Sequence, residues 1–231
     1  MSTPIIVFDL DGTLIDTAPD LLDSLNHCLR SAEVPEVEPT EIRRFIGQGS
    51  RIMIERAFAA HGKPLADGQL DALQDAFLAH YTVAMPGKSR PYPGVLDAIA
   101  RFHEAGFMTA VCTNKLEHLS RQLLEALEVA GLFRTICGAD TFNHRKPDPR
   151  HLLETIELAG GDRNRAVMVG DSRTDIDTAK AAGIPVVAVD FGYTDRPVHL
   201  FEPSRVISHF DELTVPLAET LLSVTAGQAA T

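Results

Sequence analysis

The sequence predicts an α/β fold, with a doubly wound, mainly parallel sheet and a small helical domain inserted near the start of the chain. An apolar run at residues 5–8 is followed at once by acidic residues, as in a buried parallel strand that ends at a ligand site. After residue 95, helical and strand-like apolar patterns alternate, which indicates a sheet covered by helices on both faces. Between residues 17 and 83 the apolar spacing is helical throughout.

The helical insert is predicted to contain four helices. Thr17 and Pro19 suit the start of the first helix, and leucines follow at helical spacing. Thr40 and Ser50 are the expected caps of the second and third helices. Apolar residues within 70–81 form one face of the fourth. We assign residues 16–82 to this insert, and residues 1–15 and 83–231 to the core.

A stretch rich in proline and glycine, residues 85–94, is predicted to return the chain to the core. Core helices are predicted around residues 96–102, 119–127, 152–156 and 176–182. Core strands are predicted at residues 107–112, 135–137, 166–169 and 185–189. The chain beyond Ala218 is small and polar, and no element is predicted there.

Composition excludes several classes of partner. The formal net charge is −11, which argues against nucleic acid or an anionic membrane surface. The opening apolar run is too short for a secretion signal, and no stretch approaches the length of a membrane span. Three cysteines, scattered without metal-ligand spacing, indicate reduced thiols in a cytoplasmic protein. The overall field repels an anionic substrate, so any attraction must be local.

Candidate reactive side chains follow the ends of four predicted strands: Asp9 with Asp11, Thr113 with Asn114, Lys146, and Asp171 with Asp175. In a doubly wound sheet the carboxyl ends of the strands converge on one crevice. Taken alone, each residue has a simpler interpretation, such as a helix cap or a surface lysine. Their joint placement indicates a single site, and clustered carboxylates indicate a metal ion or a phosphoryl group between them.

The same residues lie in four ordered motifs that resemble those of the haloacid dehalogenase superfamily. The motifs are Asp9-Leu10-Asp11-Gly12-Thr13-Leu14, Thr113-Asn114, Lys146-Pro147-Asp148-Pro149 and Gly170-Asp171-Ser172-Arg173-Thr174-Asp175. The resemblance covers nearly the whole chain and implies a Rossmann-like core with an inserted helical cap. Residues 17–21, 46–49, 55–57 and 92–95 are most similar to bacterial phosphoglycolate phosphatases within that superfamily. The implied activity is Mg²⁺-dependent hydrolysis of a small anionic phosphate ester, with 2-phosphoglycolate as the leading candidate.

The resemblance also assigns roles to the carboxylates. Asp9 is the expected nucleophile, which forms an aspartyl-phosphate, and Asp11 is the expected acid and base. Asp9, Asp171 and the backbone carbonyl of Asp11 are expected to hold Mg²⁺, an ion that prefers oxygen ligands. Asp175 is expected to support the site by orienting a lysine or a metal-bound water. The bound cation reverses the negative charge of the cluster locally.

The remaining candidates are expected to bind the substrate. Thr113, Asn114 and Lys146 are predicted to surround the phosphate group. The loop containing Gly47 and Gly49 is predicted to close over the substrate from the insert. Arg43, Arg44 and Arg51 flank this loop and are candidate ligands for a substrate carboxylate, although surface arginines are equally typical there. Arg44 is the one selected as a site residue.

Several alternatives stay open at this point. The same catalytic residues suit a phosphatase for a sugar phosphate or pyrophosphate, and a phosphosugar mutase of the same superfamily. A non-catalytic module that binds a phosphorylated ligand is disfavoured, because it has no use for a nucleophile that repels its ligand. A dehalogenase is disfavoured because Asp11 is present and a leaving halide needs no acid. The expected assembly is a monomer or a weak homodimer.

Overall fold

The predicted α/β core is confirmed in the computed structural model, which describes residues 3–228. Six strands form one parallel sheet, in the order β5 (Ile136–Cys137), β4 (Met108–Cys112), β1 (Ile5–Phe8), β6 (Ala166–Gly170), β7 (Val186–Val189) and β8 (Arg205–Ile207). β1 lies in the interior of the sheet, between β4 and β6. The residues that follow β1 therefore lie near the middle of the sheet, at the end where the parallel strands have their carboxyl termini.

Helices cover both faces of this sheet, because successive side chains of a strand point to opposite sides. Ile6 and Phe8 of β1 pack into the apolar cluster that contains α4 (Val95–Glu104), α5 (Glu117–Ala126) and α8 (Val215–Gln228). Ile5 and Val7 pack into a second cluster with α6 (Pro149–Ala159) and α7 (Arg173–Ala182). Short 3₁₀ turns complete the core: η2 (Ala130–Leu132), η3 (Arg163–Arg165), η4 (Val198–Phe201) and η5 (Phe210–Glu212).

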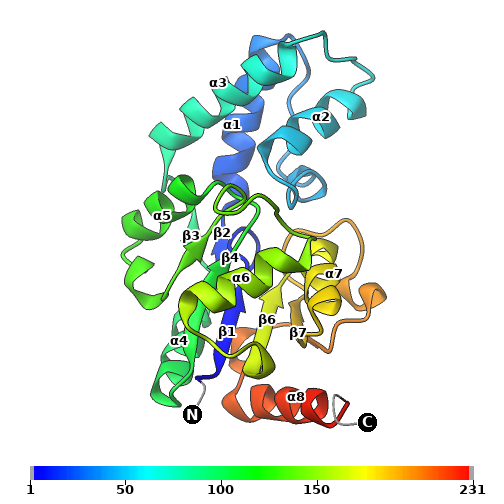
Figure 1. The fold of residues 1–231 in the computed structure, drawn as a ribbon. Helices are drawn as coiled ribbons and strands as arrows, with labels where there is room; N and C mark the ends of the chain where they lie inside the picture. The colour runs from blue at the N-terminus through cyan, green and yellow to red at the C-terminus, as the bar shows by residue number, and fades with distance from the viewer. Residues whose placement is uncertain (1–2, 229–231) are drawn as a thin grey trace.

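The helical insert stands over the edge at which the strands end (Figure 1). It consists of α1 (Ala18–Ser31), the 3₁₀ turn η1 (Ile42–Arg44), α2 (Ser50–Ala60) and α3 (Gln69–Ala84). The chain enters and leaves it through a small antiparallel pair, β2 (Ile15–Asp16) and β3 (Arg90–Pro91). The division at residues 16–82 stays a prediction.

Some predicted elements differ from the structure. The expected second helix of the insert is only the turn η1, which starts after Glu41, so Thr40 caps no helix. Ser50 is the first residue of α2, and the cap position belongs to Gly49. The chain after Ala218 continues as part of α8, in which the Ala218 and Leu222 side chains are buried. Within the described range, residues 3–228, no helix has the length and apolar character to cross a membrane.

Candidate active site

The centre of the site is a group of buried carboxylates beyond the ends of β1 and β6. Asp9, Asp171 and Asp175 each offer an oxygen, and these oxygens lie within 4.8 Å of one another. Asp9 directly follows β1, and its N–H donates to the Val169 carbonyl at 2.9 Å. Three carboxylates therefore meet in a space shielded from water, and a positive charge is needed to balance them.

Lys146 supplies part of this charge. Its Nζ lies 2.9 Å from Asp9 Oδ1 and 2.6 Å from Asp175 Oδ1, and its side chain is almost fully buried. Burial alone opposes its charge, but the neighbouring Asp175 and Asp9 carboxylates raise the pKa of Lys146 above its ordinary range. One ammonium faces three carboxylates, so the cluster keeps a net negative charge when all of them are ionised.

Burial and this excess of negative charge shift the pKa values of the carboxylates. Burial, with a contribution from Asp175, raises the pKa of Asp9 to about 7, although Lys146 acts in the opposite direction. Burial and the nearby Asp175 and Asp9 charges raise the pKa of Asp171 well above its ordinary range. The Asp9 Oδ1 atom is buried and, among the described residues, has the ion pair to Lys146 but no aligned hydrogen-bond donor. These features fit a hard divalent cation, which prefers oxygen ligands and lowers the free energy of ionised carboxylates.

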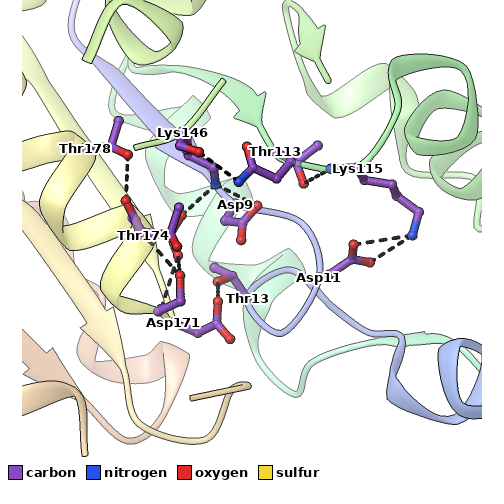
Figure 2. Close-up of polar contacts among 12 residues, drawn as sticks. Asp9, Asp11, Thr13, Thr113, Lys115, Lys146, Asp171, Thr174 and Thr178 are labelled. Carbon is purple, nitrogen blue, oxygen red and sulfur yellow. Dashed lines mark hydrogen bonds and ion pairs between the residues drawn. The ribbon is translucent and has the colours of Figure 1, made fainter. Parts of the chain in front are cut away.

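Neighbouring groups fix the orientation of Asp171 (Figure 2). Its Oδ1 accepts a hydrogen bond from Thr13 Oγ1 at 3.1 Å, and its Oδ2 accepts one from the Tyr193 N–H at 2.5 Å. Gly12, at φ +86°, passes so close that an added Cβ lies 2.3 Å from Asp171 Oδ2. Glycine at this turn therefore serves the carboxylate site through both its backbone conformation and its lack of a side chain.

Asp175 has both oxygens engaged by protein groups. Oδ1 accepts from Lys146 Nζ, and Oδ2 accepts from the Ser172 N–H at 3.1 Å and the Ser172 hydroxyl at 2.6 Å. Ser172 caps α7 together with Asp175 in a reciprocal arrangement, so Asp175 is fixed by the start of the helix. This arrangement suits the predicted supporting role, in which Asp175 orients Lys146.

Asp11 lies apart from this cluster and points toward Lys115 (Figure 2). Lys115 Nζ lies 3.1 Å from Asp11 Oδ1 and 3.3 Å from Oδ2. The Thr17 hydroxyl donates to Asp11 Oδ1 at 2.8 Å. Sequence reasoning missed Lys115, and its position immediately after Thr113 and Asn114 at the end of β4 was the available signal.

Thr113 and Asn114 are placed by the loop between β4 and α5. Thr113 is buried, and its hydroxyl oxygen accepts from the Lys115 N–H at 3.2 Å. Asn114 Nδ2 donates to the Lys146 carbonyl at 3.0 Å, while its buried Oδ1 has no partner among the described residues. Neither residue caps α5, whose cap position is Leu116. The Asn114 contact ties the lysine loop to the β4 loop.

A cavity of about 100 Å³ opens between this group of residues and the helical insert. The core side of its wall includes Asp9, Asp11, Thr113, Asn114 and Lys115. The insert side includes Gly47, Gly49, Arg51, Phe77 and Tyr81. The volume accommodates several water-sized groups, in keeping with a small ligand.

Arg44, the predicted carboxylate ligand, does not line this cavity. Its side chain is 71% exposed, and its guanidinium lies 3.5 Å from Glu41. Arg51 is the neighbouring arginine that does line the cavity. The structure therefore places Arg44 outside the cavity that Asp9, Asp11 and Thr113 line.

Tyr193 is a second residue that sequence reasoning missed. Beyond its N–H bond to Asp171, its hydroxyl donates to Asp16 at 2.5 Å and accepts from the Ala18 N–H at 2.8 Å. One residue thus connects a carboxylate of the site to the start of the helical insert. Its loop after β7 carries no motif, so the sequence offered no signal for it.

Comparisons with known proteins agree with this architecture. The model of the haloacid dehalogenase-like hydrolase family matches residues 6–189. A phosphoglycolate phosphatase of Mesorhizobium japonicum is 67% identical over 222 residues, which cover 96% of this chain and 98% of that protein. A phosphoglycolate phosphatase of Agrobacterium fabrum is 48% identical, with coverage of 98% and 97%. The crystal structure of a predicted phosphoglycolate phosphatase from Haemophilus somnus has a TM-score of 0.85 at 28% identity, with coverage of 92% and 97%.

Proposed function

The chain belongs to the haloacid dehalogenase-like hydrolase family, and we propose that it hydrolyses 2-phosphoglycolate to glycolate and inorganic phosphate. The observation that carries the chemistry is the buried group of Asp9, Asp171 and Asp175 around one lysine. A group of this kind is suited to handling a phosphoryl centre beside a cation. The substrate is supported by the 67% identity to a phosphoglycolate phosphatase over nearly the full length of both chains.

In this proposal Asp9 is the nucleophile. Its carboxylate attacks phosphorus, the bond from phosphorus to the ester oxygen breaks, and an aspartyl-phosphate forms on Asp9. Asp11 stands at the same end of β1 and lines the same cavity, so it donates a proton to the departing oxygen of glycolate. Asp11 then takes a proton from the water that attacks the aspartyl-phosphate, which releases phosphate and restores Asp9.

Other residues hold the phosphoryl oxygens. Lys146 places its ammonium 2.9 Å from Asp9 Oδ1, next to the position that the transferred group occupies. The Thr113 hydroxyl and the Asn114 side chain lie at the end of the adjacent strand and line the cavity. Fixed donors of this kind stabilise charge in the transition state without reorganisation.

Mg²⁺ is the proposed cofactor, held by Asp9, Asp171 and the backbone carbonyl of Asp11. When bound, the ion neutralises charge on the carboxylates and the phosphate group. Thr13 and Tyr193 keep the Asp171 carboxylate in one orientation for this purpose. Asp175 would hold Lys146 in place rather than the ion, because both of its oxygens accept hydrogen bonds from protein groups.

The test is release of inorganic phosphate from 2-phosphoglycolate, a sugar phosphate and pyrophosphate, each with Mg²⁺ and with a chelator. We expect Mg²⁺-dependent release, fastest from 2-phosphoglycolate. Preference for one of the other compounds contradicts the substrate proposal. Isomerisation of a phosphosugar without net phosphate release indicates a mutase, and binding without turnover indicates a non-catalytic module.

The remaining proposals concern the partners, the assembly and the cellular location of the enzyme. We expect the substrate to be the principal partner, with no nucleic acid or membrane bound. The expected assembly is a monomer or weak homodimer in the cytoplasm. Sedimentation velocity over a range of protein concentrations tests the assembly, and a stable larger oligomer contradicts it.

A further inference from the structure

Lys115 is a buried cation that the proposed catalytic steps do not use. It lies in the loop between β4 and α5, and only 5% of its side chain is exposed. Its N–H donates to Thr113 Oγ1, and its carbonyl accepts from the Ala139 N–H at 2.8 Å. The backbone is therefore fixed on the core, while the side chain lines the cavity that contains Asp9 and Asp11.

The ammonium of Lys115 lies where core and insert meet. It forms the ion pair with both oxygens of Asp11, and it lies 4.3 Å from the centre of the Tyr81 ring of α3. Burial opposes its charge, but Asp11 and Tyr81 outweigh that effect and raise the pKa of Lys115 above its ordinary range. The Lys115 ammonium is therefore held inside the cavity by an ionic partner on one side and an aromatic ring on the other.

The other cations around the cavity are less suited to bind a second anionic group. Lys146, which is not part of the cavity wall, is already engaged by Asp9 and Asp175. Arg145 lines the cavity but is exposed. Arg51 is paired with Asp71 and Gln74 on the insert, and its side chain is 47% exposed. Of the cations that line the cavity within residues 3–228, Lys115 is the buried one, and its ionic partner is Asp11, the proposed acid.

The chemistry of the proposed substrate brings its carboxylate to this point. In 2-phosphoglycolate, two covalent bonds of about 1.5 Å each separate the ester oxygen from the carboxyl carbon. The ester oxygen must face Asp11 to receive a proton. Because Asp11 lies 3.1 Å from Lys115, a carboxylate attached so closely to that oxygen comes within reach of the same ammonium.

We propose that Lys115 binds the carboxylate of the substrate, and that this carboxylate replaces Asp11 as its ionic partner. The proposal rests on the proposed function and adds the residue that selects an acidic tail. In the free enzyme the ionised Asp11 balances the charge of Lys115. In the complex the substrate carboxylate does so, and Asp11, which takes up a proton from water as it leaves Lys115, faces the leaving oxygen. Tyr81 contacts the ammonium from the insert side, so in this proposal selection depends on the position of the insert over the core.

The test compares two esters of similar length in the Mg²⁺-loaded enzyme, 2-phosphoglycolate and 2-hydroxyethyl phosphate, which lacks the carboxylate. In Lys115→Met, we expect kcat/KM for 2-phosphoglycolate to fall by about 30-fold or more relative to the neutral ester. Lys115→Arg keeps the charge and is expected to recover part of this preference. Equal losses on both esters, or an unchanged ratio, overturn the proposal and leave Lys115 as a positioning residue for Asp11.

Binding to an inactive enzyme separates recognition from proton transfer. Calorimetry on Asp9→Asn and on Asp9→Asn with Lys115→Met measures the affinity for both esters directly. We expect the second change to weaken 2-phosphoglycolate selectively, and equal affinities in both proteins contradict the proposal. Lys63→Met is the matched control, because Lys63 is exposed on the insert and donates to the Glu33 carbonyl.

Three further outcomes are distinguishable. Loss of the preference in Arg51→Met or Arg44→Ala but not in Lys115→Met assigns carboxylate binding to an arginine of the insert and overturns this proposal. If the wild-type enzyme shows no preference for 2-phosphoglycolate, the proposed function and the role of Lys115 fail together. If the wild-type preference is present and persists in Lys115→Met, only the role of Lys115 fails.

Discussion

The site has two halves, and they are built differently. Around Asp9, the side chains of Lys146, Asp171 and Asp175 are enclosed by the sheet edge and the start of α7. Around Asp11, the contacts come from Lys115 on the core and from Thr17 at the start of the insert, beside a cavity that core and insert line together. The first half uses only core elements and suits chemistry common to phosphate esters. The second half depends on the insert and suits recognition of one substrate.

The largest expected effect comes from removal of the nucleophile in the Asp9 half. Asp9→Asn leaves the fold in place because the side chains have nearly equal volume, and we expect activity to fall by about 10⁴-fold or more on every ester. Phosphate release measures the loss, and circular dichroism checks the fold. Substantial residual turnover that differs between esters contradicts the assignment of shared chemistry to the Asp9 half.

Metal removal addresses the same half. Chelation is expected to abolish phosphate release, and added Mg²⁺ is expected to restore it. Because the ion binds the folded state, Tm is also expected to rise with Mg²⁺ concentration in the wild type and far less in Asp171→Asn. Differential scanning calorimetry measures this, with the exposed Asp97→Asn as the matched control. An equal rise in Tm for wild type and Asp171→Asn contradicts a cation site at these carboxylates.

A substitution in the insert tests the role of the cavity half. Gly49, at φ +90° and ψ 165°, precedes α2 and lines the cavity, and this conformation is strained for any other residue. Gly49→Ala is expected to lower the free energy of unfolding by about 1–3 kcal/mol and to raise KM more than it lowers kcat. Gly62→Ala, at φ +64° with open space around it, is the control. A fall in kcat alone contradicts a substrate-facing role for this loop.

The smallest expected effect is on stability without metal. The pKa of Asp9 is raised from 3.8 to about 7 on folding, so the folded state holds this proton more tightly than the unfolded state. The stabilisation of the folded state by this proton is complete below about pH 4 and is lost as the pH rises through about 7. In chelator, Asp9→Asn is therefore expected to have a higher Tm than wild type at pH 8, by several degrees, with a smaller difference at pH 5. Equal Tm values of the wild type and Asp9→Asn at both values of pH contradict a raised pKa of the buried Asp9 carboxylate.

The core was largely predictable because its signals are local. A run such as Ile5–Phe8 ends directly at the acidic pair, so strand and candidate residues are identified together. The same holds for Thr113 after β4 and Asp171 after β6. Helix ends in the insert were less predictable, because Thr40 and Ser50 are typical capping residues by type but no cap bond forms at either.

Asp11 and the glycine loop of the cavity half were predicted, but its side-chain pairing was not, because that depends on contacts between distant segments. Lys115 pairs with Asp11 across 104 residues, and Tyr193 reaches Asp16 across 177. A lysine after a strand is usually exposed, whereas this one is buried between Asp11 of the core and Tyr81 of α3. Arg44 was predicted from its charge near the glycine loop, whereas the fold turns it toward Glu41 and solvent.

The most direct test of the central claim is a crystal structure with Mg²⁺ and beryllium fluoride, a mimic of a phosphoryl group on a carboxylate. We expect one Mg²⁺ between Asp9 and Asp171, the mimic attached to Asp9, and Lys146 beside it. A cation bound elsewhere, or a mimic on a residue other than Asp9, contradicts it.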